Sequence, residues 1–404
     1  MKQKSSIPKI RFPEFSDEWK EYSMGELYSE RKEPGNDFLP ILSVSIHTGI
    51  SDGELDEESL GKTVRRSEDK STYKHVYPGD LVFNMMRAWQ GAIGSAPSEG
   101  MISPAYISAM PNEKVYSPFM DYYVKRKEMI EQINSLSYGV TDFRKRLYWD
   151  SFIKVKCNLP SVVEQKRIAD ILKQYDRIIA IQEKKLGRLK NLKKGLLQKM
   201  FPEEGESAPE IRFPGYTDSW KQCKLDKVVT FFSGLTYSPA DIRPSGTLVL
   251  RSSNVKDGEI IDADNVYVNP DVVNSENVKD GDIIVVVRNG SRALIGKHAE
   301  IKGEMPHTVI GAFMTGIRSE RPSFVNALLN TSRFDKEIEK NMGATINQIT
   351  GYMFSKMEFM IPSPDEQNVI GDFFKKLDNL IALHQCECNK YIKLKKGLLQ
   401  QMSV

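Results

Sequence analysis

Two stretches of the sequence share one pattern of apolar positions, and the pattern predicts two long helices. Apolar residues recur at alternating intervals of three and four, which is typical of a coiled-coil seam. Polar residues interrupt both seams at the same two steps, which we interpret as register markers or partner contacts. These are Gln182 and Lys193 in the first stretch and His384 and Lys395 in the second. The apolar seam residues are Ile168, Leu172, Tyr175, Ile179, Leu186, Leu189, Leu196 and Met200, then Ile370, Phe374, Leu377, Ile381, Cys388, Tyr391, Leu398 and Met402.

The ends of both predicted helices carry ordinary helix signals. Each helix follows a proline, Pro160 or Pro362, and has a glutamate in its first turn, Glu164 or Glu366, where the helix dipole favours an acidic residue. At about 1.5 Å per residue, the first seam is roughly 48 Å long. This length indicates a spacer rather than a helix packed within one small domain.

The whole chain is an internal repeat. Residues 8–27 return as residues 209–228, and residues 159–200 return as residues 361–402 with 18 of 42 positions identical. The intervening stretches diverge, which indicates two related domains with different surfaces. The predicted segments are a globular domain at 1–158, a helical spacer at 159–204, a second globular domain at 205–360 and a second helical spacer at 361–404.

The repeat predicts an α+β fold in which two globular domains of mixed α/β structure are separated by two long helices that form an antiparallel coiled coil. Antiparallel pairing would relate the two domains by an approximate two-fold axis within one chain. Double-stranded DNA has a matching two-fold symmetry, so the arrangement suits a DNA site read at two points. A dimerisation stalk with no role in DNA binding remains the alternative.

Composition limits the class of protein but does not identify a ligand. The 404 residues carry a net charge of only +3, so any basic surface must be local. Apolar runs stay short of the roughly 18 residues that a membrane span needs. Residues 1–13 lack the apolar core of a signal peptide, and the four cysteines show no disulfide framework, so we expect a reducing cytoplasm.

The sequence contains near misses to catalytic and metal-binding motifs but no complete one. Asn269-Pro270-Asp271 lacks the second proline and the aromatic residue of an adenine methyltransferase motif, so we interpret it as a turn. Residues 290–298 resemble a phosphate-binding loop but contain one residue too many and no hydroxyl residue after the lysine. His384 and Cys388 are seam positions, so their proximity in sequence to Cys386 does not predict a metal site. We expect no catalytic residue, no metal and no cofactor in this chain.

Two loops in each half carry the side chains expected to read DNA bases. Arginine suits guanine, and asparagine or glutamine suits adenine, in the major groove. The first loop follows an apolar strand predicted at Leu81–Met86 or Ile283–Val287, and the second precedes each long helix. Hairpin tips are often polar without binding anything, and this reading stays open beside the functional one. The first-loop candidates are Arg87, Trp89 and Gln90, and Arg288, Asn289, Ser291 and Arg292; the second-loop candidates are Thr141, Arg144, Lys145 and Arg146, and Thr345, Asn347 and Gln348.

Roles within these loops differ by residue type. The basic run Arg144 to Arg146 suits phosphate contacts, whereas Asn347 and Gln348 suit base contacts. The repeated Trp19 and Trp220 are interpreted as core residues that anchor the first strand of each domain.

The order of the repeated blocks resembles the specificity subunits of type I restriction-modification systems. The resemblance is carried by the tryptophan-bearing openings, the Pro-Ser-x-x-Glu-Gln helix starts and the Leu-Lys-Lys-Gly-Leu-Leu-Gln helix ends. It implies a non-catalytic subunit whose two target recognition domains each read half of an asymmetric, bipartite DNA site. It also implies that the helices hold two methyltransferase subunits, which bind S-adenosylmethionine, and that a motor-nuclease subunit using ATP and Mg joins for cleavage in host defence.

Two further classes of function remain open, a stand-alone bipartite DNA-binding protein and a coiled-coil adaptor that binds other proteins. A specificity subunit predicts association with a methyltransferase, and a stand-alone protein predicts specific DNA binding without one. An adaptor predicts no DNA footprint with any partner. Apolar residues outside the seams would be available to partner helices, namely Ile171, Ile178, Leu192 and Leu197.

Overall fold

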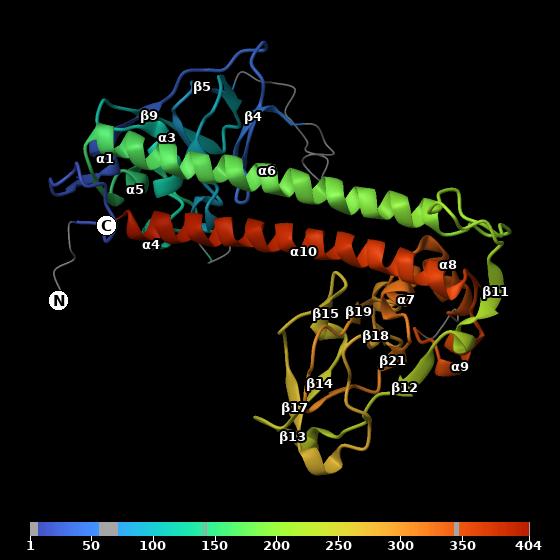
Figure 1. The fold of residues 1–404 in the computed structure, drawn as a ribbon. Coiled ribbons are helices and arrows are strands. Elements are labelled where there is room, and N and C mark those ends of the chain that lie inside the picture. The colour runs from blue at the N-terminus through green and yellow to red at the C-terminus, as the bar shows by residue number, and fades with distance from the viewer. Residues whose placement is uncertain (1–6, 56–71, 140, 142–143, 343–346, 404) are drawn as a thin grey trace. The chain divides into compact units, whose positions relative to one another are not determined.

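The structure is a computed structural model that describes residues 7–55, 72–139, 141, 144–342 and 347–403. The chain divides into two compact units. Unit 1 comprises Met1–Gln182 and Glu387–Val404, and unit 2 comprises Glu183–Cys386. Two unbroken helices, α6 (Val162–Met200) and α10 (Pro364–Gln401), each contribute to both units and are the long green and red ribbons of Figure 1. The predicted four-segment division stays a prediction, because each unit contains parts of both long helices.

Unit 1 is built on a four-stranded antiparallel sheet in the order β2-β9-β6-β7. Three two-stranded ladders, β1-β10, β3-β4 and β5-β8, accompany it. Its strands are β1 (Lys20–Ser23), β2 (Tyr28–Arg31), β3 (Leu42–Ser45), β4 (Gly49–Glu54), β5 (Lys74–Val76), β6 (Leu81–Asn84), β7 (Ile93–Ser95), β8 (Gly100–Ile102), β9 (Tyr106–Pro111) and β10 (Lys156–Leu159); its shorter helices are α1 (Met24–Leu27), α3 (Ser117–Tyr123), α4 (Lys127–Leu136) and α5 (Trp149–Phe152).

Unit 2 repeats this plan with the sheet β12-β21-β18-β19 and the ladder β11-β22. A second sheet, β13-β17-β14-β20, includes the parallel pair β14-β20, and β15 pairs with β16. The strands are β11 (Lys221–Lys224), β12 (Thr230–Ser233), β13 (Ile242–Arg243), β14 (Thr247–Leu250), β15 (Val255–Lys256), β16 (Glu259–Ile260), β17 (Val266–Val268), β18 (Ile283–Val286), β19 (His298–Glu300), β20 (Thr308–Ile310), β21 (Met314–Arg318) and β22 (Glu358–Ile361); the shorter helices are α7 (Pro322–Leu329), α8 (Ser332–Asn341) and α9 (Gly351–Lys356).

The strands that lead to the predicted loops, β6 and β18, are continuous buried runs, as their apolar sequences predict. Each follows a turn whose glycine has a positive φ, 94° at Gly79 and 82° at Gly281, a conformation that favours glycine. A buried aspartate closes each turn. Asp80 accepts from the backbone of Tyr77 at 3.1 Å, and Asp282 accepts from the backbone of Lys279 at 2.8 Å. The turn that precedes each of these strands therefore has the same geometry in both units.

The repeated motifs at the domain openings and helix starts are joined by ion pairs. Arg11 donates to both carboxylate oxygens of Glu164 at 2.8 Å, and Arg212 binds Glu366 in the same way at 2.7 Å. Both glutamates are buried. Trp19 and Trp220 are 3% exposed and lie in the two main cores, which confirms their interpretation as core residues.

Within each unit, parts of α6 and α10 pack antiparallel, as predicted. In unit 1, Asp176 accepts from Lys395, and Met402 joins the core that contains Leu172. In unit 2, Lys193 binds Asp378 at 2.6 Å. The lysines that interrupt the seams therefore make cross-helix ion pairs, and the α+β class with an antiparallel helix pair is confirmed.

The predicted apolar seam positions are buried or half-buried along both helices. One prediction about the outer helix surface is wrong. Leu197 does not face outward but is buried in the core of unit 2, because it lies next to the seam position Leu196 in the last turns of α6. Among the described helices, none has the length and apolarity needed to cross a membrane.

Candidate nucleic-acid interface

In unit 2 the two predicted loops meet at the end of β18. The backbone amide of Ile349 donates to the carbonyl of Val287 at 2.8 Å, and Arg288 and Gln348 form an antiparallel bridge. The amide of Asn289 reaches the carbonyl of Asn347 at 3.3 Å. Loops separated by more than fifty residues in the sequence thus form one surface.

Two of the predicted base-reading amides also hold this surface together. The Asn289 side chain donates to Ser252 Oγ at 3.0 Å and accepts from the backbone of Ser291 at 2.9 Å. The Asn347 side chain donates to the carbonyl of Gly290 at 3.1 Å. A side-chain amide has two protons and two lone pairs, so each retains at least one proton and one lone pair for further contacts while its position is set by the loop.

Arg288 is an exposed cation of the first loop. Its side chain is exposed, and the guanidinium lies 4.9 Å from the ring centre of Phe313. Stacking on a ring orients the guanidinium plane and leaves its edge donors free for an acceptor such as a guanine. Ser291 and Arg292 are also exposed. Gln348 is half-buried, and its side chain makes no hydrogen bond to another described residue.

Unit 1 brings its two loops together in the same backbone register. The amide of Leu147 donates to the carbonyl of Met85 at 2.8 Å, and Met85 directly follows β6. A bridge between Tyr138 and Arg146 closes the second loop next to this contact. The two units therefore present the same pair of loops at the same strand end.

The side chains on the unit 1 loops differ from those of unit 2. Arg87 and Gln90 are exposed, whereas Trp89 is half-buried against the core and donates its indole N–H to the carbonyl of Met86 at 3.0 Å. Trp89 therefore shapes the first loop of unit 1.

The second loop of unit 1 presents a basic run. Thr141, Arg144 and Arg146 are exposed, Lys145 is half-buried, and the amide of Arg144 donates to the carbonyl of Thr141 at 2.9 Å. Flexible, exposed cations suit phosphate contacts. The predicted Thr345 lies outside the described residues.

Sequence reasoning missed two residues that complete the unit 2 surface, Phe313 and Ser252. Phe313 precedes β21, is 54% exposed, and supports Arg288 through both its ring and its carbonyl. Ser252 follows β14 and holds Asn289. Neither stands out in the sequence, because their roles depend on how distant strands pair. The described residues contain no cluster of His, Cys, Asp and Glu suited to a metal ion.

Comparisons with known proteins identify the family. A family model described as the type I restriction modification DNA specificity domain matches residues 30–191 and 217–394. The type I restriction enzyme MjaVIII specificity subunit from Methanocaldococcus jannaschii is 25% identical over 313 residues, which cover 74% of this chain and 73% of that protein.

Solved structures share the fold. The crystal structure of a type I restriction-modification S subunit from M. genitalium gives a TM-score of 0.63 at 13% identity, covering 98% of this chain and 99% of that one. A chain from a structural study of complex assembly and conformational transition of the type I R-M system gives a TM-score of 0.55 at 15% identity, covering 95% and 97%. The chain belongs to the family of type I restriction-modification specificity subunits and carries the DNA specificity domain of that family twice.

Proposed function

We propose that this chain selects an asymmetric, bipartite DNA site, with each unit reading one half-site through its pair of loops. One observation carries the proposal. The backbone contacts Leu147 to Met85 and Ile349 to Val287 are equivalent and equally long, 2.8 Å, yet the side chains around them differ. A common geometry with different donors is what two readers of unlike half-sites need.

Within this proposal the loop residues divide into base readers and phosphate contacts. Arg288 and Gln348 are the unit 2 base readers, with Asn289 and Asn347 contributing the remaining capacity of their amides. Arg87 and Gln90 take that role in unit 1. Arg144, Lys145 and Arg146 contact phosphates, which positions the unit without specifying sequence.

The proposed partners are two methyltransferase subunits, with a motor-nuclease subunit added for cleavage. Support comes from exposed apolar side chains on the long helices, including Ile181 at 65%, Leu192 at 52% and Leu383 at 56%. Helix faces of this kind are covered when partner helices pack on them. In this assembly S-adenosylmethionine binds to the methyltransferase, and ATP with Mg binds to the motor-nuclease, so this chain supplies choice of site rather than chemistry.

The test is methylation of genomic DNA by the purified chain mixed with its methyltransferase, followed by methylation-site sequencing. We expect one bipartite sequence to be modified by the mixture, and no turnover of S-adenosylmethionine by the chain alone. Turnover by the chain alone would contradict the non-catalytic role. Site-specific footprints without a methyltransferase would favour a stand-alone DNA-binding protein, and the absence of any footprint with the partner would favour an adaptor.

A further inference from the structure

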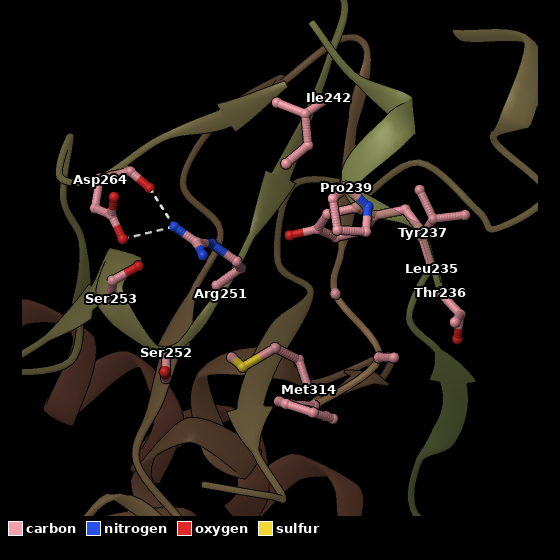
Figure 2. A pocket seen from close by; sticks show the side chains of 13 residues that line it. Leu235, Thr236, Tyr237, Pro239, Ile242, Arg251, Ser252, Ser253, Asp264 and Met314 are labelled. Carbon is pink, nitrogen blue, oxygen red and sulfur yellow. Dashed lines mark hydrogen bonds and ion pairs between the residues drawn. The ribbon is translucent and has the colours of Figure 1, made fainter. Parts of the chain in front are cut away.

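A pocket of about 580 Å³ opens in unit 2 beside the loops. Its walls come from three segments and from Asp264. The segments are residues 235–242 between β12 and the start of β13, residues 251–253 after β14, and residues 311–314 at the start of β21. Figure 2 shows Arg251, Tyr237 and Met314 on different sides of the hollow. Its volume falls in the range of pockets that bind small organic groups.

The pocket and the proposed reading surface share walls. Ser252 lines the pocket and accepts from the side chain of Asn289 at 3.0 Å. Phe313 also lines it, and the carbonyl of Phe313 accepts from the backbone of Val287 at 3.0 Å and of Arg288 at 3.2 Å. A DNA half-site held on Arg288 therefore lies against the rim of this pocket.

The walls are mainly apolar and aromatic, and they include two buried polar atoms that have no hydrogen-bond partner among the described residues. Arg251 Nη2 donates to the carbonyl and to Oδ2 of Asp264, both at 2.6 Å, as the dashed lines of Figure 2 show. Arg251 Nε and Ser253 Oγ are buried without a hydrogen-bond partner among the described residues. Buried donors are usually satisfied in folded proteins, so two such donors on side chains that line one pocket suit a ligand that brings an acceptor to them.

We propose that this pocket receives one unstacked nucleobase of the half-site read by unit 2, a proposal that rests on the proposed function. Tyr237 and Phe313 supply aromatic surface, on which the flat face of a base stacks. Arg251 Nε and Ser253 Oγ donate to an exocyclic carbonyl oxygen. Thymine, cytosine and guanine have such an oxygen and adenine does not, so the base in this pocket is distinct from an adenine that a methyltransferase modifies.

The experiment measures binding of the complete complex, chain plus methyltransferase, to duplexes that contain the methylated site. At each position in turn, the partner base is replaced by an abasic site, which lowers the cost of unstacking the base that remains. We expect affinity to rise about ten-fold at one position in the unit 2 half-site, where the remaining base carries a carbonyl.

Three variants make the result specific. Ser253→Leu fills the pocket and abolishes the gain, while Ser245→Leu, the same change at an exposed residue outside the pocket, retains it. Arg251→Lys keeps a positive charge near Asp264 but removes the Nε donor, and reduces the gain without filling the pocket.

The outcomes separate this inference from the proposed function. A complex that distinguishes its site from scrambled DNA but shows no such position, or keeps the gain in Ser253→Leu, would overturn the nucleobase pocket alone. A complex that does not distinguish the two DNAs would overturn both. Loss of methyltransferase binding by Ser253→Leu in the absence of DNA would assign the pocket to a protein partner instead.

Discussion

Substitution of Arg288 directly tests the proposal that unit 2 reads one half-site. Its guanidinium is oriented by Phe313 and exposed, so its edge can make a bidentate contact with guanine. Arg288→Ala should weaken binding to the cognate site by roughly 1 to 3 kcal/mol and relax choice at one position of one half-site. Methylation-site sequencing of the variant complex measures this. Altered choice in both half-sites would contradict independent reading by the two units.

We propose that the basic run of unit 1 contacts phosphates, which carry no sequence information, so its substitution should have a different effect. Arg144→Ala should weaken binding to all sequences alike and reduce the slope of log affinity against log salt by about 1. Titrations at several salt concentrations, on cognate and scrambled DNA, give both quantities. Arg288→Ala serves as the comparison, and a base-specific loss in Arg144→Ala would reverse the roles assigned to the two residues.

His298 makes the stability of unit 2 depend on pH. Its Nδ1–H donates to the carbonyl of Gly296, and its Nε2 accepts from Asn330, each at 3.0 Å, so the neutral ring is satisfied. Burial lowers the pKa of His298 to about 4. Between about pH 6.5 and pH 4 the unfolded chain therefore binds a proton that the folded chain does not. As the pH is lowered through this range, the free energy of unfolding decreases by up to roughly 3 kcal/mol.

Hydrogen exchange of β18 and β19 at several pH values measures this effect within unit 2. His298→Gln should flatten the decline in protection toward low pH, and the same substitution at the exposed His47 in unit 1 is the control. A decline of unchanged steepness in His298→Gln would assign the pH dependence to other groups.

At the scale of the elements, a buried ion pair joins each domain opening to its long helix, and one substitution can break it. The side chain of Glu164 is 1% exposed and that of Arg11 is 11% exposed. Glu164→Gln leaves the Arg11 charge without its partner and should destabilise the start of α6 by about 3 kcal/mol. The exposed pair Lys156 and Glu21, at 63% and 57%, is the matched control, and breaking it should cost less than about 1 kcal/mol.

Local hydrogen exchange at the first turns of α6 reports the loss. The double variant Arg11→Leu with Glu164→Leu should be more stable than Glu164→Gln, because no unpaired charge remains. Equal destabilisation by Glu164→Gln and by the exposed control would show that the pair does not hold the opening to the helix.

The sequence was most informative where a period or a repeat was present. The three-four spacing predicted the two long helices, and duplication of the lysine positions 193 and 395 indicated register marking or a partner contact. The structure places both lysines in cross-helix ion pairs, with Asp378 and Asp176. It could not reveal Phe313 or Ser252, because neither has a local signal and both act through strand pairing. It also could not show that Asn289 is held within its own loop.

At the scale of the whole chain, the repeat makes the two cross-helix ion pairs equivalent to each other. Asp176 binds Lys395 and Lys193 binds Asp378, and Lys395 and Asp378 are the counterparts of Lys193 and Asp176 in the second half. A fragment of residues 1–204 contains one Asp and one Lys of this set. Two copies could therefore form both pairs with each other while burying their apolar seams, at about 25 cal/mol per Å² of apolar surface.

We expect this fragment to form a symmetric dimer and, with the methyltransferase, to modify an interrupted palindrome built from the unit 1 half-site. A charge exchange sharpens the test. Fragments with Lys193→Asp or with Asp176→Lys each face two like-charge contacts in a homodimer, whereas a mixture of the two restores both ion pairs. Analytical ultracentrifugation should show weakened self-association of each variant and strong association of the mixture. A monomeric wild-type fragment, or one that still selects the asymmetric site, would contradict the idea that the two halves of the chain are equivalent partners.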